Sequence, residues 1–332
     1  MPSVLVRLRP TGPWRIGPDS GDRDRVERIY HSDALYSAVC GAMGRLGALD
    51  DWLDATARSS APAVRFSSCF PFHQETLYVL PPRHIWPPAA SSKVRWKGAR
   101  FVPFPVVDAL LAGKPLSEDA WVVDGESECL MPSSAPAGAT LFRASVRSSA
   151  AVDRAGDSAT PHSVACLEFT PGSGLWFIAT FADDAAQERW NQRVPAAIRL
   201  LADSGFGGER SRGWGRSEMP DFRENPVLLA HSNGAGSETG HWMLSLFHPA
   251  ESDAVDWRRG NYSLTTRSGR VESTSGWGQM KQNTRMVAEG SVLVSPAEPR
   301  GAAADVAPEG FAHPVYRAGF GLSLPVPLKV PA

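Results

Sequence analysis

The order of apolar and polar residues predicts short strands and a few helices. Val4 to Arg9 alternates apolar and polar side chains, the two-residue period of a half-buried strand. A polar loop follows, and then four apolar residues recur at spacings of four, four and three. This spacing puts one apolar stripe on a helix of about four turns. Ser32 or Asp33 is expected to cap that helix at its start. The stripe consists of Leu35, Val39, Met43 and Leu46.

Similar patterns continue along the chain. A second helix is expected over 183–203, with two aspartates at its start, and short helices near 106–111 and 252–259. The polar segment 150–162 joins two strand patterns and is typical of an exposed hairpin tip. Strands are expected at 64–70, 76–80, 141–147, 164–169, 175–181, 242–247, 262–267, 286–294 and 316–324.

This order of elements predicts an α+β fold, with helices on one face of an antiparallel sheet as in a ferredoxin-like domain. A chain of 332 residues is long enough for two such units. The pattern of residues along the chain changes near residue 222, and the segment 231–240 is typical of a linker or long turn. We therefore expect an N-terminal ferredoxin-like domain over 1–222, with a hairpin inserted at about 143–165, and a C-terminal ferredoxin-like domain over 223–332.

Composition and motifs narrow the function. The net charge is −1, so a polyanion would have to be held by local clusters of Lys and Arg. The four cysteines are far apart, which argues against a zinc site, and HExxH and GxSxG are absent. We expect no cofactor and no metal. No apolar run approaches the length of about 20 residues that a membrane span needs, and the start lacks a secretory pattern. A cytoplasmic protein is expected.

The segment GFGGERSRGWGR, 205–216, holds five glycines and three arginines. It fits neither the phosphate loop of nucleotide hydrolases nor the Rossmann fingerprint. Its glycines could bring backbone N–H groups close to a ligand, while its arginines suit phosphate. A glycine-rich turn with solvated arginines is the alternative that this segment alone leaves open.

Other basic clusters favour a nucleic-acid groove. Ser91 to Arg100 has four cations and one tryptophan, and arginines flank the expected hairpin. A second glycine–arginine stretch, RSGRVESTSGWG, covers 267–278. Each cluster alone is typical of a solvated face. Together, basic clusters interleaved with aromatic residues favour contacts with phosphates and stacking on bases.

Three segments in this order carry a resemblance to a known family: HSDALYSAVCGAM, GFGGERSRGWGR and GWGQMKQNTRMVAEGSVL. With them the chain resembles RAMP proteins of type III CRISPR effectors, and most closely the fourth subunit of the Csm (type III-A) complex, in the Cas-five-like group. The resemblance spans nearly the whole chain. It implies two ferredoxin-like (RRM-like) domains, a glycine-rich loop and a thumb-like hairpin that intrudes on the guide–target duplex.

The resemblance also implies a role. Such a subunit is not a nuclease; it holds the 5′ repeat-derived end of the CRISPR RNA in an antiviral ribonucleoprotein. It bridges the large polymerase/cyclase-like subunit and a Cas-seven-like backbone subunit, and meets target RNA only indirectly. The RNA-binding residues are then expected to be His31, Ser32, Lys93, Arg95, Lys97, Arg143, Arg147, Arg154, Gly205, Gly207, Gly208, Arg210, Ser211, Arg212, Gly213, Gly215, Gly276 and Gly278.

Two alternatives stay open. A related RAMP endoribonuclease that processes precursor CRISPR RNA often uses a histidine near the first helix as general acid/base, and His31 would take that role. That family carries its glycine loop near the C-terminus, however, whereas 217–332 follow it here. The other alternative is a protein scaffold whose arginines pair with acidic surfaces of neighbouring subunits.

Overall fold

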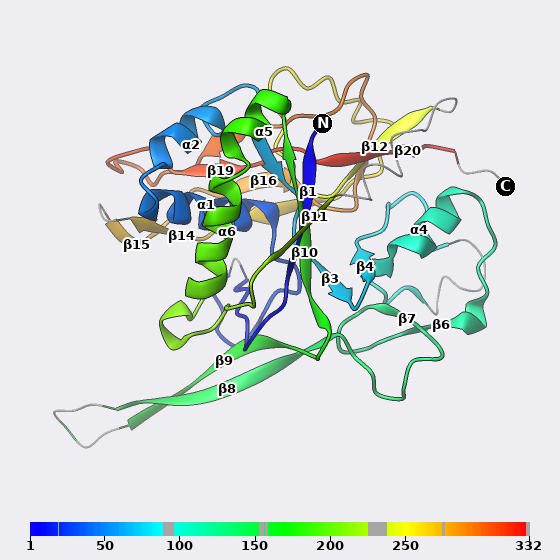
Figure 1. The fold of residues 1–332 in the computed structure, drawn as a ribbon, viewed down its shortest axis with the longest axis horizontal. Coiled ribbons are helices and arrows are strands. Elements are labelled where there is room, and N and C mark those ends of the chain that lie inside the picture. The colour runs from blue at the N-terminus through cyan, green and yellow to red at the C-terminus, as the bar shows by residue number, and fades with distance from the viewer. Residues whose placement is uncertain are drawn as a thin grey trace.

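A central antiparallel sheet organises the chain. The computed structural model describes residues 1–18, 20–88, 96–152, 156, 159–224, 238–273 and 276–329. The sheet has seven strands in the order β11–β1–β10–β3–β4–β5, and β2 also pairs with β10 (Figure 1). Its strands are β1 (Ser3–Leu8), β2 (Val64–Phe66), β3 (Phe70–His73), β4 (Thr76–Val79), β5 (Val102–Pro103), β10 (Ser173–Phe181) and β11 (Asp221–Glu224).

Most helices lie on one side of this sheet (Figure 1). They are α1 (Ser32–Arg45), α2 (Leu49–Ala55), α5 (Asp184–Trp190) and α6 (Arg193–Ser204). The helix expected over 183–203 is therefore two helices, and Pro195 lies in the first turn of the second, where a missing N–H costs nothing. Asp183 caps α5 by accepting a hydrogen bond from the Ala186 N–H, at 2.8 Å. None of the helices in the described ranges is both long and apolar enough to span a membrane.

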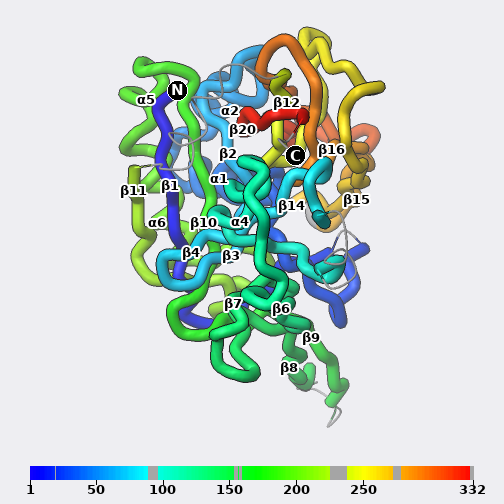
Figure 2. The backbone as a smooth tube through the Cα atoms, turned by 90° about the vertical axis from the view of Figure 1, so that its right-hand side faces the viewer, coloured from blue at the N-terminus to red at the C-terminus, as the bar shows by residue number. Residues whose placement is uncertain are grey.

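A long hairpin projects from the body of the molecule (Figures 1 and 2). It is formed by β8 (Phe142–Val152) and β9 (Ala159–Phe169), which pair in register from Phe142 opposite Phe169 to Val152 opposite Ala159. The strands run further than expected, into the segment whose polarity was typical of a tip. Mostly small uncharged residues occupy that part of both strands. Such residues are compatible with an exposed pair of strands as well as with a loop.

A small unit lies beyond β4. It contains α4 (Phe104–Leu111), η1 (Glu118–Ala120) and the pair β6 (Trp121–Val123) and β7 (Leu130–Pro132). Trp96 leads into it, buried and stacked on Trp86 with ring centroids 5.7 Å apart. The tryptophan of the basic cluster 91–100 is therefore a core residue and is not available to stack on a base.

The chain after residue 237 consists of strands and turns. It forms the sheet β17 (Val292–Leu293), β12 (Thr239–Met243) and β20 (Ser323–Pro327), and three two-stranded pairs. Described residues here contain no helix, so the helix expected near 252–259 is wrong, and turns lie there instead. The pairs are β13 (Leu264–Arg267) with β16 (Thr284–Val287), β14 (Arg270–Ser273) with β15 (Gly276–Met280), and β18 (Ala303–Asp305) with β19 (Tyr316–Ala318).

The mixed α/β class built on antiparallel sheets is confirmed. The succession β1, α1, β2/β3, β10, α6, β11 follows the order of a ferredoxin-like unit. The described residues after 237 do not support a second unit of that kind, because they have no helix to cover a sheet. The boundary between 222 and 223 stays a prediction, and residues 231–237 of the expected linker lie outside the described part.

One hydrophobic core joins the two halves of the chain. Phe104 packs against both Trp176 of β10 and Trp242 of β12, with ring centroids 5.6 and 5.7 Å apart. The Ser68 N–H donates to the carbonyl oxygen of Leu244 at 2.9 Å. Aromatic side chains contribute a large part of the apolar area of a core. The C-terminal strands therefore fold onto the N-terminal half and share its core.

Candidate nucleic-acid interface

A groove of about 990 Å³ lies along α1, between the glycine loop and the C-terminal strands. α1 packs against α6 and β19, and in Figure 1 β14 lies below it. We call it the basic groove because, among the described residues lining it, six carry a positive charge and only Asp33 is a carboxylate. The six are Arg15, Arg210, Arg267, Arg270, Lys281 and Arg317.

The start of α1 is tied to the C-terminal half. Ser32 accepts a hydrogen bond from the Leu246 N–H at 3.0 Å, and its own N–H donates to Ser68 Oγ at 2.8 Å. The expectation that Ser32 or Asp33 caps α1 is wrong, because the N-cap residue is His31 and its side chain makes no capping bond. Ser32 is buried and does not line the groove, so it is not placed to touch RNA there.

Asp33 holds two arginines at the floor of the groove. Its Oδ2 and Oδ1 accept from Nε and Nη2 of Arg267, both at 3.1 Å, and Oδ2 also accepts from Arg317. Burial alone would raise the pKa of Asp33, but the positive charges of Arg267 and Arg317 outweigh it and hold that pKa well below its usual value. The carboxylate is thus ionised and fixes both guanidinium planes.

His31 has a buried partner. Its Nδ1 lies 2.7 Å from Oε1 of Glu289, and Ser68 Oγ donates to the same oxygen. Burial would raise the pKa of Glu289, but the charge of His31 and the hydrogen bonds from His31 and Ser68 lower it overall. The His31 side chain is 12% exposed and lines the basic groove. One ring nitrogen is therefore committed to a structural contact.

Three glycines of the loop 205–216, Gly205, Gly207 and Gly215, serve the packing of the chain itself. A Cβ on Gly207, whose φ is +70°, would lie 2.3 Å from the Arg15 carbonyl oxygen, and one on Gly215 would lie 2.0 Å from that of Phe206. Phe206 stacks on buried Trp14 with ring centroids 5.2 Å apart. The close approach that these glycines allow is thus to the chain itself, and it needs no ligand. Gly205, Gly207 and Gly208 also line the groove, so a close approach of RNA to their backbone stays a prediction.

Two arginines of the glycine loop point to different parts of the molecule. Arg210 lines the basic groove, whereas Arg212 faces the hairpin. The Arg212 guanidinium lies 3.0 Å from Nε2 of His162 and 3.4 Å from Oγ of Ser149. The loop therefore connects the groove to the outer half of the projecting hairpin, where Ser149 pairs with His162. Ser211 and Gly213 do not line the groove, and Ser211 is exposed.

The hairpin arginines do not reach the basic groove. Arg143 and Arg147 both form ion pairs with Glu168 on the opposite strand. They line a separate cavity of about 520 Å³ at the base of the hairpin. Both guanidinium groups stay largely exposed, so they can still meet a neighbouring molecule.

The remaining sequence candidates are scattered. Lys97 is exposed next to the small unit around α4 and lines neither cavity. Gly276 and Gly278 lie in β15, where the Gly278 carbonyl accepts from Arg270 at 2.6 Å. Lys93, Arg95 and Arg154 lie outside the described residues.

Sequence reasoning missed several groove residues. The stretch 267–278 contained Arg267 and Arg270, but only its glycines were chosen. Lys281 and Arg317 stand in no cluster, and Arg15 lies in a loop without any motif. The Arg15 guanidinium also donates hydrogen bonds to four backbone carbonyl oxygens, so it orders the neighbouring loop.

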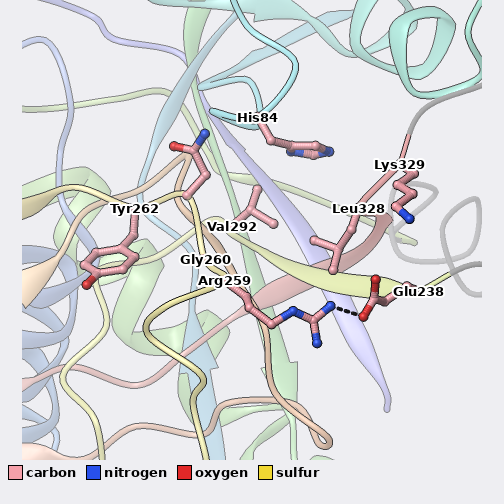
Figure 3. Close-up of a pocket in the computed structure, with 9 residues that line it drawn as sticks. His84, Glu238, Arg259, Gly260, Tyr262, Val292, Leu328 and Lys329 are labelled. Carbon is pink, nitrogen blue, oxygen red and sulfur yellow. Dashed lines mark hydrogen bonds and ion pairs between the residues drawn. The ribbon is translucent and has the colours of Figure 1, made fainter. Parts of the chain in front are cut away.

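A cavity on another face has a different character. It has a volume of about 530 Å³ and lies between His84, the 259–262 turn and the end of β20 (Figure 3). Arg259 there is paired with Glu238, and His84 Nε2 lies 3.0 Å from the Pro327 carbonyl oxygen. This cavity is a weaker candidate for a polyanion, because Arg259 and Lys329 face one carboxylate, Glu238, whereas the basic groove has six cations to one carboxylate. In the part of the chain that the structure describes, no three His, Cys, Asp or Glu side chains are placed to hold a metal ion.

Comparison with known proteins identifies the fold. No curated protein matches the chain by sequence. Residues 237–326 match the model of the CRISPR Csm4 C-terminal domain. The chain is similar to a chain of the crystal structure of the Csm3–Csm4 subcomplex of the type III-A CRISPR–Cas interference complex, with 16% identity, a TM-score of 0.67, and 97% of this chain and 99% of that chain covered.

A second solved structure agrees. It is the crystal structure of the Csm1–Csm4 cassette in complex with cA4, with 18% identity, a TM-score of 0.60 and full coverage of both chains. At such identities the likeness is one of fold. Residues 237–326 thus match the CRISPR Csm4 C-terminal domain, and the chain as a whole shares the fold of chains in these Csm3–Csm4 and Csm1–Csm4 structures, in agreement with the resemblance found in its sequence.

Proposed function

We propose that this protein is a non-catalytic subunit of a type III-A CRISPR interference complex and binds the 5′ repeat-derived end of the CRISPR RNA in the basic groove. The observation that carries this is the charge of the groove, six cations against one carboxylate among its described lining residues. A protein with a net charge of −1 can hold a polyanion only through such a local concentration.

The partners follow from the same proposal. The similar structures are complexes of Csm4 with Csm1 and with Csm3. We infer that this chain bridges a large polymerase/cyclase-like subunit and a Cas-seven-like backbone subunit. The hairpin of β8 and β9 projects from the body, where it can meet a neighbouring molecule (Figure 1). In this proposal it is the thumb that reaches the guide–target duplex, which makes contact with target RNA indirect.

His31 lies where it can bind RNA, but its contact with Glu289 does not by itself decide between binding and cleavage, because a carboxylate on Nδ1 also orients a catalytic histidine. A general acid or base must exchange its proton with the substrate. Here Nδ1 of His31 is held by a buried carboxylate, and the imidazole is largely covered. The arrangement fixes the start of α1 at the edge of the groove, where the other ring nitrogen could contact RNA.

Replacing Arg210 and Arg270 tests the proposal. Both line the groove from opposite sides, one on the glycine loop and the other at the start of β14. The double variant Arg210→Ala/Arg270→Ala should bind single-stranded handle RNA more weakly in a filter-binding assay. Its plot of log affinity against log salt should be shallower by about 1.4, since each lost phosphate contact removes about 0.7.

Arg212→Ala is the matched control, because Arg212 belongs to the same loop but faces the hairpin. It should keep the affinity and the salt dependence of the unaltered protein. Undiminished RNA binding by the double variant would overturn the proposal. If the double variant also failed to join its partner subunits, the scaffold alternative would take its place.

A further inference from the structure

A second groove of about 970 Å³ adjoins the basic groove. Its walls come from the 18–29 loop, the segment around Arg83, Arg100, the base of the hairpin at Ala144–Val146, and β13. His31 and Arg267 line both grooves, so the two meet at the start of α1. We call it the second groove.

The ridge where the grooves meet is fixed on both sides. His31 is paired with Glu289, and Arg267 with Asp33. These contacts join the start of α1 to two C-terminal segments and are buried. A strand that crosses from one groove to the other would therefore pass over a preorganised surface.

Three arginines of the second groove have no carboxylate partner among the described residues. Arg25 and Arg83 are exposed, and neither guanidinium has an ion pair or hydrogen bond in that part of the chain. Arg100 lies over the ring of Phe101, with 5.8 Å from Cζ to the ring centroid. Acidic residues are fewer in the lining: Glu289 is taken by His31, and Asp24 and Glu27 flank Arg25 along the chain.

The backbone holds two of these arginines in place. The Arg83 N–H donates to the Gly290 carbonyl oxygen at 2.9 Å, which ties it to the turn that carries Glu289. The Arg100 N–H donates to the Glu128 carbonyl oxygen at 2.8 Å. Donors on a fixed backbone lose less freedom when they bind a ligand.

Hydroxyl groups complete the lining. Ser263, Thr265 and Thr266 of the β13 region and Ser145 of the hairpin lie in the second groove. Hydroxyl side chains suit the ribose 2′-hydroxyl, which both donates and accepts hydrogen bonds. Arginines without a carboxylate partner, hydroxyls and continuity with the basic groove favour RNA over an acidic protein segment.

We propose that the single-stranded RNA continues from the basic groove over His31 and Arg267 into the second groove, where Arg83 and Arg100 contact its phosphates. The inference rests on the proposed function and goes beyond it, because it assigns a second binding segment and the direction in which the strand runs, toward the base of the hairpin. Arg25 supports the same backbone from the opposite wall.

RNA length separates the two grooves. The full chain is titrated with labelled single-stranded RNAs of about 4 and about 12 nucleotides, which span the usual site sizes of such grooves. Arg83→Ala/Arg100→Ala should bind the short RNA as the unaltered protein does and the long RNA about tenfold more weakly. Its salt dependence for the long RNA should be shallower by about 1.4, two contacts at about 0.7 each.

Arg189→Ala/Arg199→Ala is the matched control. Both are exposed arginines that lie over an aromatic ring, a contact that the half-buried Arg100 also makes, and neither lines a groove. It should leave both affinities unchanged. All replaced residues are at least partly exposed, and circular dichroism verifies that each variant is folded.

The outcomes distinguish this inference from the function on which it rests. If Arg210→Ala/Arg270→Ala weakens binding and Arg83→Ala/Arg100→Ala binds both RNAs normally, the second groove does not hold RNA and the proposed function stands. If neither double variant weakens binding, both proposals fail. Normal RNA binding by Arg83→Ala/Arg100→Ala, with loss of a partner subunit in co-purification, would assign the second groove to a protein.

Discussion

Asp33 and Arg267, separated by 234 residues, form a two-point ion pair in the interior, with Arg267 Nε and Nη2 each 3.1 Å from a carboxylate oxygen. Arg317 shares the same carboxylate. Removing one partner of a buried ion pair leaves a charge without compensation, which costs about 3–5 kcal/mol. The ion pair therefore stabilises the fold as well as lining the groove, because it connects the first helix to the C-terminal strands.

Asp33→Asn should lower the free energy of unfolding by about 3–5 kcal/mol in chemical denaturation. Asp54→Asn is the control, because Asp54 pairs with Arg58 at 2.8 Å on the surface, with 66% of its side chain exposed. An exposed pair contributes about 0–1 kcal/mol. Equal losses in the two variants would show that burial of the Asp33 contact has no energetic consequence.

The same carboxylates predict an acid transition. The folded-state pKa values of Asp33 and Glu289 are both lowered, so each contributes stability that is fully present above its unfolded pKa, about 3.9 and 4.3. That stability is lost as the pH falls through the folded values. Unfolding free energy should therefore decrease below about pH 4, and Asp33→Asn should show a flatter decrease. A parallel pH profile in Asp33→Asn would contradict the assignment.

The start of α1 shows which features of the helix could be predicted from the sequence and which could not. The apolar stripe was right for Leu35, Val39 and Met43, which are fully buried, but wrong for Leu46, which follows the last residue of α1 and is exposed. Ser32 and Asp33 have the chemistry of N-cap residues. They bind Leu246 and Arg267 instead, and no local pattern can reveal a partner more than two hundred residues away.

The groove shows the same limit. The glycine loop was found in the sequence because its residues are neighbours, and Arg210 does line the groove. Lys281 and Arg317 lie on separate C-terminal segments and meet Arg210 only in the folded chain. The glycines were expected to let the backbone approach a ligand, and the structure shows that a Cβ on Gly207 would already meet the Arg15 carbonyl oxygen. A sequence reveals that a position needs glycine, but not what approaches it.

Gly207→Ala should destabilise the protein more than Gly213→Ala does. Both residues have positive φ, which costs an ordinary residue about 1–3 kcal/mol. At Gly207 a Cβ also meets the Arg15 carbonyl at 2.3 Å, whereas at Gly213 the nearest atom is Arg216 Cζ at 4.0 Å. Thermal unfolding measures the difference. RNA capture should fall in Gly207→Ala as the loop shifts, and equal melting temperatures would refute the packing role.

Arg212→Ala should loosen the hairpin. The side chain joins the glycine loop to Ser149 on β8 and His162 on β9, and these are exposed contacts. Hydrogen exchange should become faster around 145–149 and 160–164 and stay unchanged in α6, because local opening is governed by such contacts. Arg216→Ala, an exposed arginine of the same loop, is the control. Exchange in the hairpin that does not respond to Arg212→Ala would mean that the loop does not hold it.

His31→Ala tests the endoribonuclease alternative. We expect any RNA cleavage by the assembled complex to be intact, since the proposed function gives His31 a role in RNA binding and in the contact with Glu289. The variant should nevertheless lose stability, by about 3–5 kcal/mol, because Glu289 remains buried without its partner. Adding Glu289→Gln should recover part of that loss, and a double-mutant cycle measures the coupling. Cleavage that disappears in His31→Ala while the complex still assembles would make His31 a catalytic residue and the protein a processing enzyme.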